Sequence, residues 1–154
     1  MDTTSPTEAL FYHLERQPLE AVLPLLLEKT LERGWRAVVQ AGSQERLDAL
    51  DQQLWTYREE SFLAHGTAKD GSPQRQPIYL TLDDDNPNGA AVRFLVDGAE
   101  PQDVSGLTRV VLMFDGRDET AVDAARRHWK TLKAQGCAVT YWQQSAAGRW
   151  EKKA

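Results

Sequence analysis

The chain has 154 residues, of which 41% are hydrophobic and 27% are charged. This mixture is typical of a globular protein and excludes a disordered or fibrous chain. A domain of this size buries about 70% of its unfolded surface, so it needs no disulfide or metal to fold. The net charge of −5 argues against a general binder of duplex DNA, although it does not exclude a local basic patch. We expect one domain, residues 1–154.

Three features of the sequence favour a cytoplasmic location. The single cysteine, Cys137, cannot form an internal disulfide and is predicted to be a buried strand residue. Residues 1–7 are polar and acidic, where a signal peptide would carry positive charge. No apolar run approaches the roughly 20 residues that span a bilayer. We therefore expect a cytoplasmic protein that makes no membrane contact.

The first part of the chain alternates predicted strands with predicted helices. Strands are expected at 9–14 and 35–42, and helices at 18–34 and 43–55. Pro24 lies inside the first helical pattern, where a proline costs about 3 kcal/mol, so we expect a kink or a late helix start. Alternating strands and helices indicate βαβ units and a parallel sheet.

The second predicted helix carries its own signals. Ser43 is a suitable cap, and Leu47, Leu50 and Leu54 form an inner face. The polar connection that follows, residues 56–76, is long enough to be functional or mobile.

Large aromatic residues surround a charged turn at the start of this connection. Trp55 and Phe62 are of the residue types that anchor protein interfaces. Packing at the edge of the core would, however, account for the presence of one of these two aromatic residues. Both interpretations stay open at this point. His65, a few residues later, is expected to fix the loop rather than to act in catalysis.

The remaining elements follow the same pattern. Strands are expected at 77–82, 90–98, 108–116 and 137–144, and a helix is expected at 117–136. Residues 83–89 have the composition of a turn, and their three aspartates lack the ligand spacing of a calcium loop. Gly148 is expected to permit a final turn. Together the elements predict one α/β domain with five or six strands and three main helices.

Standard nucleotide-binding loops are absent from the sequence. Neither G-x-G-x-x-G nor G-x-x-x-x-G-K-[ST] occurs, and the turn after the first strand contains no glycine. Asp115 ends an apolar strand, where a magnesium-binding aspartate would lie in a phosphate-binding protein. Without a phosphate loop we favour a simple strand-to-helix turn. The alternative is a small α/β nucleotide-binding regulator or enzyme that uses Asp115.

No arrangement of residues indicates catalysis. His13, His65 and His128 are scattered and are not in metal-ligand spacing with Cys137. No G-x-S-x-G motif is present. We predict no catalytic residue, no metal site and no cofactor.

Two side-chain stripes distinguish the last predicted helix. Val122, Ala125, Trp129 and Leu132 form an apolar stripe, and Arg126, Lys130 and Lys133 form a basic one beside it. The bases late in the helix would complement its dipole. Equally, Trp129 would wall a pocket for an acidic peptide that ends in an aromatic residue and a carboxylate. Both interpretations remain open.

Several stretches together resemble the chi subunit of the bacterial DNA polymerase III clamp-loader complex. They are FYHL at 11–14, LERGWRAVVQAG at 31–42, LDQQLWTYREESFLAHG at 50–66 and GSPQRQP at 71–77. The combination L-W-x(5–6)-S-F-x-x-H is fairly specific. An R-x-x-[aromatic]-K pattern follows at Arg126, Trp129 and Lys130.

The resemblance implies a three-layer Rossmann-like α/β domain, with a mostly parallel sheet, helices on both faces and no nucleotide-binding loop. It implies an accessory subunit without catalytic activity that links the clamp loader to single-stranded DNA-binding protein during DNA replication. Contact with single-stranded DNA would be indirect, because the subunit grips that protein's acidic, phenylalanine-terminated tail.

The resemblance also assigns two surfaces. Tail binding maps to Arg126, Trp129 and Lys130, where the family usually has tyrosine in place of Trp129. Contact with the psi subunit, or its replacement in the clamp loader, maps to Trp55 and Phe62. Residues 146–154 are expected to be a lineage-specific extension.

Overall fold

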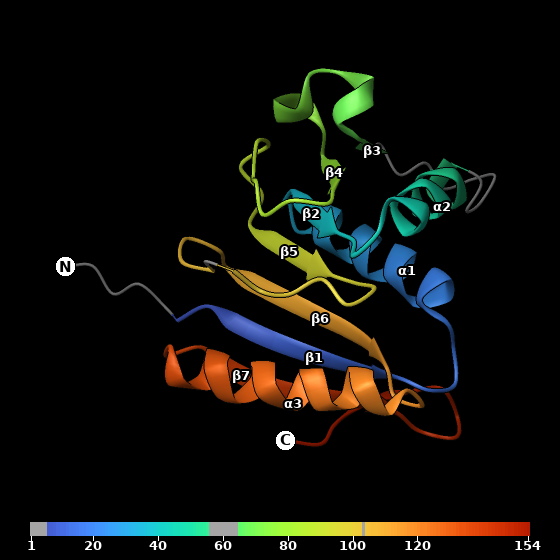
Figure 1. Cartoon of the computed structure of the whole chain (residues 1–154), viewed down its shortest axis with the longest axis vertical. Coiled ribbons are helices and arrows are strands. Elements are labelled where there is room, and N and C mark those ends of the chain that lie inside the picture. Colours follow the sequence, from blue (N-terminus) through green and yellow to red (C-terminus); the bar gives the residue numbers. More distant parts are fainter. Residues whose placement is uncertain (1–5, 56–64, 103) are drawn as a thin grey trace.

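The computed structural model describes residues 6–55, 65–102 and 104–154, with only the backbone at Trp55. Figure 1 shows the arrangement of its strands and helices. The α-helices are α1 (Leu19–Glu32), α2 (Gln44–Trp55) and α3 (Glu119–Ala134), and short 3-10 helices span Ala68–Asp70 and Pro73–Arg75. The strands are β1 (Glu8–Leu14), β2 (Ala37–Gln40), β3 (His65–Gly66), β4 (Ile78–Thr81), β5 (Val92–Leu95), β6 (Arg109–Asp115), β7 (Ala138–Gln144) and β8 (Trp150–Lys152).

The strands form one sheet in the order β3-β4-β2-β5-β6-β1-β7-β8. Each pair within the described residues is parallel except β7 with β8. The predicted α/β fold with a mostly parallel sheet is therefore confirmed. The predicted number of strands, five or six, was too low, because β3 and β8 are too short to give a periodic signal in the sequence.

The helices pack on both faces of the sheet, and an apolar core lies between the layers on each face, as a three-layer domain requires. Alternate residues of β1 point to opposite faces: Leu10 packs in the core under α1 and α2, whereas Phe11 packs in the core under α3. Leu27 of α1 and Leu50 of α2 belong to the first core, and Leu132 of α3 belongs to the second. The helices thus cover both faces, as expected for a Rossmann-like domain.

Pro24 is accommodated inside α1, which begins at Leu19 directly after Pro18. Of the two expected alternatives, the late start was wrong, and the kink stays a prediction. Pro24 has no N–H to donate to the carbonyl of Glu20 four residues earlier. The side chain of Gln53 in α2 donates to that carbonyl instead, at 2.9 Å. A neighbouring helix therefore satisfies the acceptor that the proline leaves, while Pro24 itself is buried.

Helix α2 follows its sequence signals closely. The backbone N–H of Arg46 donates to the Ser43 hydroxyl at 3.2 Å, so the predicted cap is confirmed. Leu47, Leu50 and Leu54 are buried, as their spacing predicted. His65 is buried, and its Nε2 lies 3.0 Å from Oδ1 of Asp51 in α2. This contact ties β3 to α2, and the expected role of His65 in fixing the loop before it stays a prediction, because residues 56–64 lie outside the described structure.

The aspartate-rich turn between β4 and β5 serves the structure of the sheet. Arg93 is buried, and it donates to the Gln40 side chain and to the carbonyls of Asp83 and Asp85. Burial lowers the pKa of the Arg93 guanidinium, and the nearby aspartates oppose that shift. The buried Arg93 thus holds the turn in place by donating to two of its backbone carbonyls.

Gly148 permits the predicted turn, which leads into β8. The N–H of Gly148 donates to the carbonyl of Ser145 at 2.9 Å, and Gly148 has a φ of 83°. Cys137 lies just before β7 and is half-buried, so the prediction of a buried strand residue was wrong. Among the described residues, no helix is long and apolar enough to cross a membrane.

Candidate functional site

Helix α3 is positioned by a well-formed N-terminus. The Asp118 side chain accepts from the backbone N–H groups of Thr120 and Ala121, at 3.0 and 3.4 Å. Ala125 and Leu132 are buried and Val122 and Trp129 are half-buried, so the predicted apolar stripe faces the sheet. Arg126, on the adjoining stripe, is exposed.

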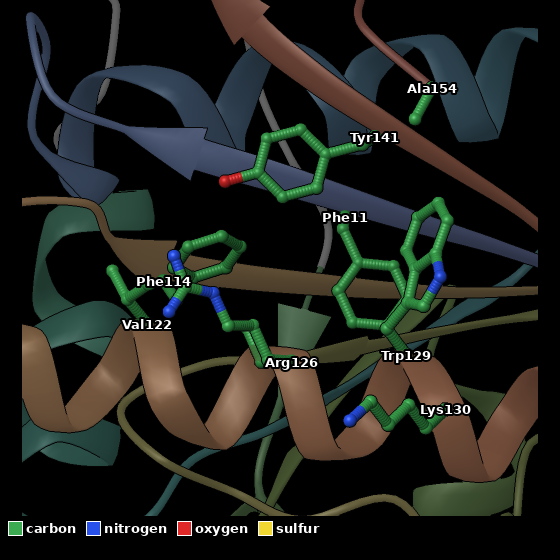
Figure 2. Close-up of a pocket in the computed structure, with 9 residues that line it drawn as sticks. Phe11, Phe114, Val122, Arg126, Trp129, Lys130, Tyr141 and Ala154 are labelled. Atoms are coloured by element: carbon green, nitrogen blue, oxygen red, sulfur yellow. The ribbon is translucent and has the colours of Figure 1, made fainter.

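A pocket of about 390 Å³ lies between α3 and the strands beneath it. Its lining consists of Phe11, Phe114, Val122, Ala125, Arg126, Trp129, Lys130, Tyr141 and Ala154 (Figure 2). The structure therefore brings together the three side chains predicted for tail binding. Lys133, the last residue of the basic stripe, is not part of this lining.

Aromatic rings make the floor and one wall of the pocket. The ring centroid of Trp129 lies 5.3 Å from that of Phe11 and 6.2 Å from that of Tyr141. Phe114 lies 6.0 Å from Tyr141. Tilted and edge-on rings at these separations attract one another and fix the shape of the wall. The pocket is thus suited to an apolar or aromatic group.

Tyr141 is held by a hydrogen-bonded chain at the edge of the pocket. Its hydroxyl lies 2.5 Å from Nδ1 of His13, and Nε2 of His13 lies 3.4 Å from the carboxylate of Glu15. Burial raises the pKa of Tyr141 above 10.0, while Arg126 opposes the shift. The hydroxyl therefore stays protonated at neutral pH. A Cβ at Gly116 would overlap with the imidazole of His13, so only glycine allows this packing.

Two cations border the apolar floor on the side of α3. Figure 2 shows the Arg126 side chain reaching from α3 toward Phe114, with Lys130 one turn further along. The Arg126 guanidinium lies 3.7 Å from the Asp123 carboxylate, but both side chains are largely exposed. Exposed ion pairs of this kind contribute little to the stability of the fold. The guanidinium thus remains able to bind a carboxylate. The arrangement can hold an aromatic ring and an anionic group together.

A second cavity, of about 650 Å³, lies at the carboxyl ends of β1, β5 and β6, where α/β proteins often bind ligands. Five carboxylates but three arginines line it: Glu20, Asp97, Glu100, Asp115 and Asp118, with Arg46, Arg117 and Arg127. This excess of negative charge disfavours phosphate. Asp115 is exposed and accepts from the N–H of Arg117 at 2.9 Å, which confirms the predicted strand-to-helix turn.

The residues expected to meet the psi subunit fall at the edge of the described structure. Trp55 ends α2 without a described side chain, and Phe62 lies outside the described residues. Their role stays a prediction.

Sequence reasoning missed four residues of the pocket: Phe11, Phe114, Tyr141 and Ala154. Phe11 and Phe114 lie in predicted strands, so the missing information was the order of the strands. The alternation along β7 was the available signal for Tyr141, since Val139 and Tyr141 face α3. No sequence signal placed Ala154 beside the pocket.

Comparison with known proteins gives two consistent matches. The family model described as "DNA polymerase III chi subunit, HolC" matches residues 7–140. A curated protein of Rickettsia prowazekii (strain Madrid E), "Probable DNA polymerase III subunit chi", is 29% identical over 99 residues. That alignment covers 64% of this chain and 58% of the relative, so the chain spans less than two thirds of the relative's length.

Proposed function

Since the chain belongs to the DNA polymerase III chi subunit family, we propose that it links the clamp loader to single-stranded DNA-binding protein during replication. The ligand is that protein's acidic C-terminal tail, and the α3 pocket is its site. The chain acts as an accessory subunit, and its contact with single-stranded DNA runs through the tail-bearing protein.

The observation that carries this proposal is the combination of an aromatic pocket with cations on its rim. Phe11, Phe114 and Trp129 offer an apolar space for a terminal phenylalanine ring. Arg126 and Lys130 offer charge-assisted hydrogen bonds to the terminal carboxylate and to the acidic residues before it. A phenylalanine-terminated acidic peptide matches both features at once.

Titration of a tail peptide against the full chain tests the proposal. We expect binding of micromolar strength that weakens as salt is added, because exposed charges are screened over about 10 Å at 0.1 M. The Arg126→Ala variant is expected to bind about ten-fold less tightly, in keeping with loss of a charge-assisted contact. Isothermal titration calorimetry or fluorescence anisotropy gives the affinities.

Two controls separate pocket binding from general attraction between charges. Lys133→Ala removes a cation from the same helix outside the pocket lining and should leave the affinity nearly unchanged. A peptide without its terminal phenylalanine should fail to bind. Equal affinities of wild type and Arg126→Ala would refute the site assignment.

We also assign the end of α2 and the connection after it to the psi subunit or its replacement. Large aromatic side chains at Trp55 and Phe62 support this assignment, since such residues dominate the energy of protein interfaces. Co-purification of a clamp-loader partner with the wild-type chain, and its loss with Trp55→Ala, tests it. Retention of the partner by Trp55→Ala would count against Trp55.

A further inference from the structure

The segment after the family match completes the pocket. The family model ends at residue 140, whereas two pocket residues, Tyr141 and Ala154, lie beyond it. In Figure 2, Ala154 lies across Tyr141 from α3, on the opposite side of the pocket. The hairpin formed by the end of β7, the turn at Gly148 and β8 therefore supplies a wall that the matched region does not contain.

Specific contacts fix this hairpin in place. The ring of Trp150 meets Tyr12 edge-on with centroids 4.9 Å apart, and the Gln144 side chain donates to the carbonyl of Gly148 at 3.2 Å. Beyond β8, the N–H of Lys153 donates to the carbonyl of Tyr141 at 2.7 Å, and the N–H of Tyr141 donates to the carbonyl of Ala154 at 3.3 Å. Residues 153 and 154 thus lie alongside Tyr141.

The two lysines of the hairpin lie on opposite faces of the sheet. Lys152 pairs with Trp142, whose ring stacks on Tyr12 on the side of α1. Because directly opposed residues of an antiparallel pair share a face, Lys152 points away from the pocket. Glu151 pairs with Gln143, which is two residues from Tyr141 and shares its α3 face. Nζ of Lys153 lies 3.3 Å from the Glu151 carboxylate, so the Lys153 side chain lies on the α3 side as well.

We propose that the hairpin, residues 145–154, forms a second bank of the pocket and that Lys153, which pairs with Glu151 on that bank, is a specificity-determining residue for acidic peptides. Arg126 and Lys130 line the pocket on the side of α3, and Ala154 lines it on the other side. Lys153 is not part of this lining, but it is exposed, adjoins Ala154 and lies on the same face of the sheet. The acidic residues that precede the terminal aromatic would lie between the two banks. Nζ of Lys153 lies 3.3 Å from the Glu151 carboxylate, but both side chains are half-exposed. Such an ion pair is weak, so the Lys153 ammonium can exchange Glu151 for an acidic group of a ligand. The inference rests on the proposed tail binding.

A matched pair of charge reversals tests the proposal. Lys153→Glu and Lys152→Glu change the net charge equally and lie one residue apart, on opposite faces. We expect Lys153→Glu to weaken binding of the acidic tail peptide about three- to ten-fold at low salt, and Lys152→Glu to bind like wild type. A peptide with its acidic side chains replaced by amides, but with its terminal phenylalanine kept, should bind both variants equally. Circular dichroism checks that each variant folds.

The outcomes distinguish the two levels of the argument. If the wild-type chain does not bind the tail peptide, the proposed function fails and this inference falls with it. If the wild type binds but the two variants have equal affinities, the hairpin does not determine specificity and the proposed function stands.

Discussion

Trp129 has a structural role in the fold, and we propose a binding role for the same side chain. It packs against Phe11 and Tyr141 and also lines the pocket beside Arg126. A half-buried aromatic of this kind keeps a pocket open, because its neighbours hold one face while the other stays accessible. The resemblance to chi subunits includes an aromatic residue at this place, usually tyrosine. We therefore expect tail binding to depend on the packing of this ring rather than on the indole N–H.

Substitutions at Trp129 should separate ring packing from size. Trp129→Tyr keeps a ring against Phe11 and is expected to bind the tail peptide within about three-fold of wild type. Trp129→Ala removes the wall and should weaken binding more than ten-fold, with a loss of unfolding free energy of about 2–4 kcal/mol. Calorimetric titration and urea denaturation measure the two effects. Tight binding by a folded Trp129→Ala variant would contradict the assignment.

The lowered pKa of His128 predicts that stability depends on pH. Burial lowers its pKa from 6.5; Glu100 opposes this shift and Arg127 adds to it. Below about pH 6.5 the unfolded chain takes up a proton that the folded chain does not yet bind, so the free energy of unfolding falls as the pH falls. Above that pH both states are neutral and the effect vanishes.

We therefore expect urea denaturation to show declining stability of the wild type between pH 7.5 and 5.5. The His128→Gln variant should decline less over the same interval, because it has no group at this position to protonate. Superimposable profiles for the two proteins would exclude His128 as a cause.

At the scale of elements, one of the contacts between α1 and α2 depends on Pro24. Gln53 of α2 donates to the carbonyl of Glu20, which Pro24 leaves without its helical donor. We expect Gln53→Leu to lower the unfolding free energy by about 0.5–1.5 kcal/mol. In a Pro24→Ala background the backbone N–H returns to the carbonyl, so the same substitution should cost less. A double-mutant cycle in urea measures the coupling, and additive effects would rule it out.

Elements with strong local signals were predictable from the sequence, and the others depend on distant partners. The spacing of the leucines in α2 and of the apolar stripe in α3 indicates which side of each helix faces inward. The short apolar runs at 9–14 and 108–116 indicate the buried strands β1 and β6. The sequence predicted the range of α1 closely but could not show how Pro24 is accommodated, because Gln53, which donates to the free carbonyl, lies 29 residues later. Strand β8 forms because β7 offers an edge to pair with, which three residues cannot reveal. The pocket was predictable in part for the same reason. The spacing of Arg126 and Lys130 along α3 predicted its cations, whereas Ala154 reaches the pocket only because residues 153 and 154 pair with Tyr141.

At the scale of the whole molecule, α2, which ends at Trp55, and α3, which carries Arg126, pack near opposite ends of the sheet. Helix α2 packs against α1, β3 and β4, whereas α3 packs against β6 and β7. The strand order places β3 and β4 at one end and β7 at the other, and Figure 1 shows α2 and α3 far apart. An adaptor needs such separation, because two partners must bind without excluding each other.

Independent binding of the two partners is the prediction at this scale. The tail peptide should bind the chain with the same affinity, within about two-fold, whether or not a clamp-loader partner occupies the α2 side, because sites this far apart without shared contacts act additively. Titration of labelled peptide against the free chain and against the co-purified complex measures both affinities. Arg126→Ala should weaken the peptide in both forms and leave the partner bound, and Trp55→Ala should do the reverse. Displacement of the partner by the peptide would show that the two surfaces overlap or are coupled, and an adaptor that holds both proteins at once would then be excluded.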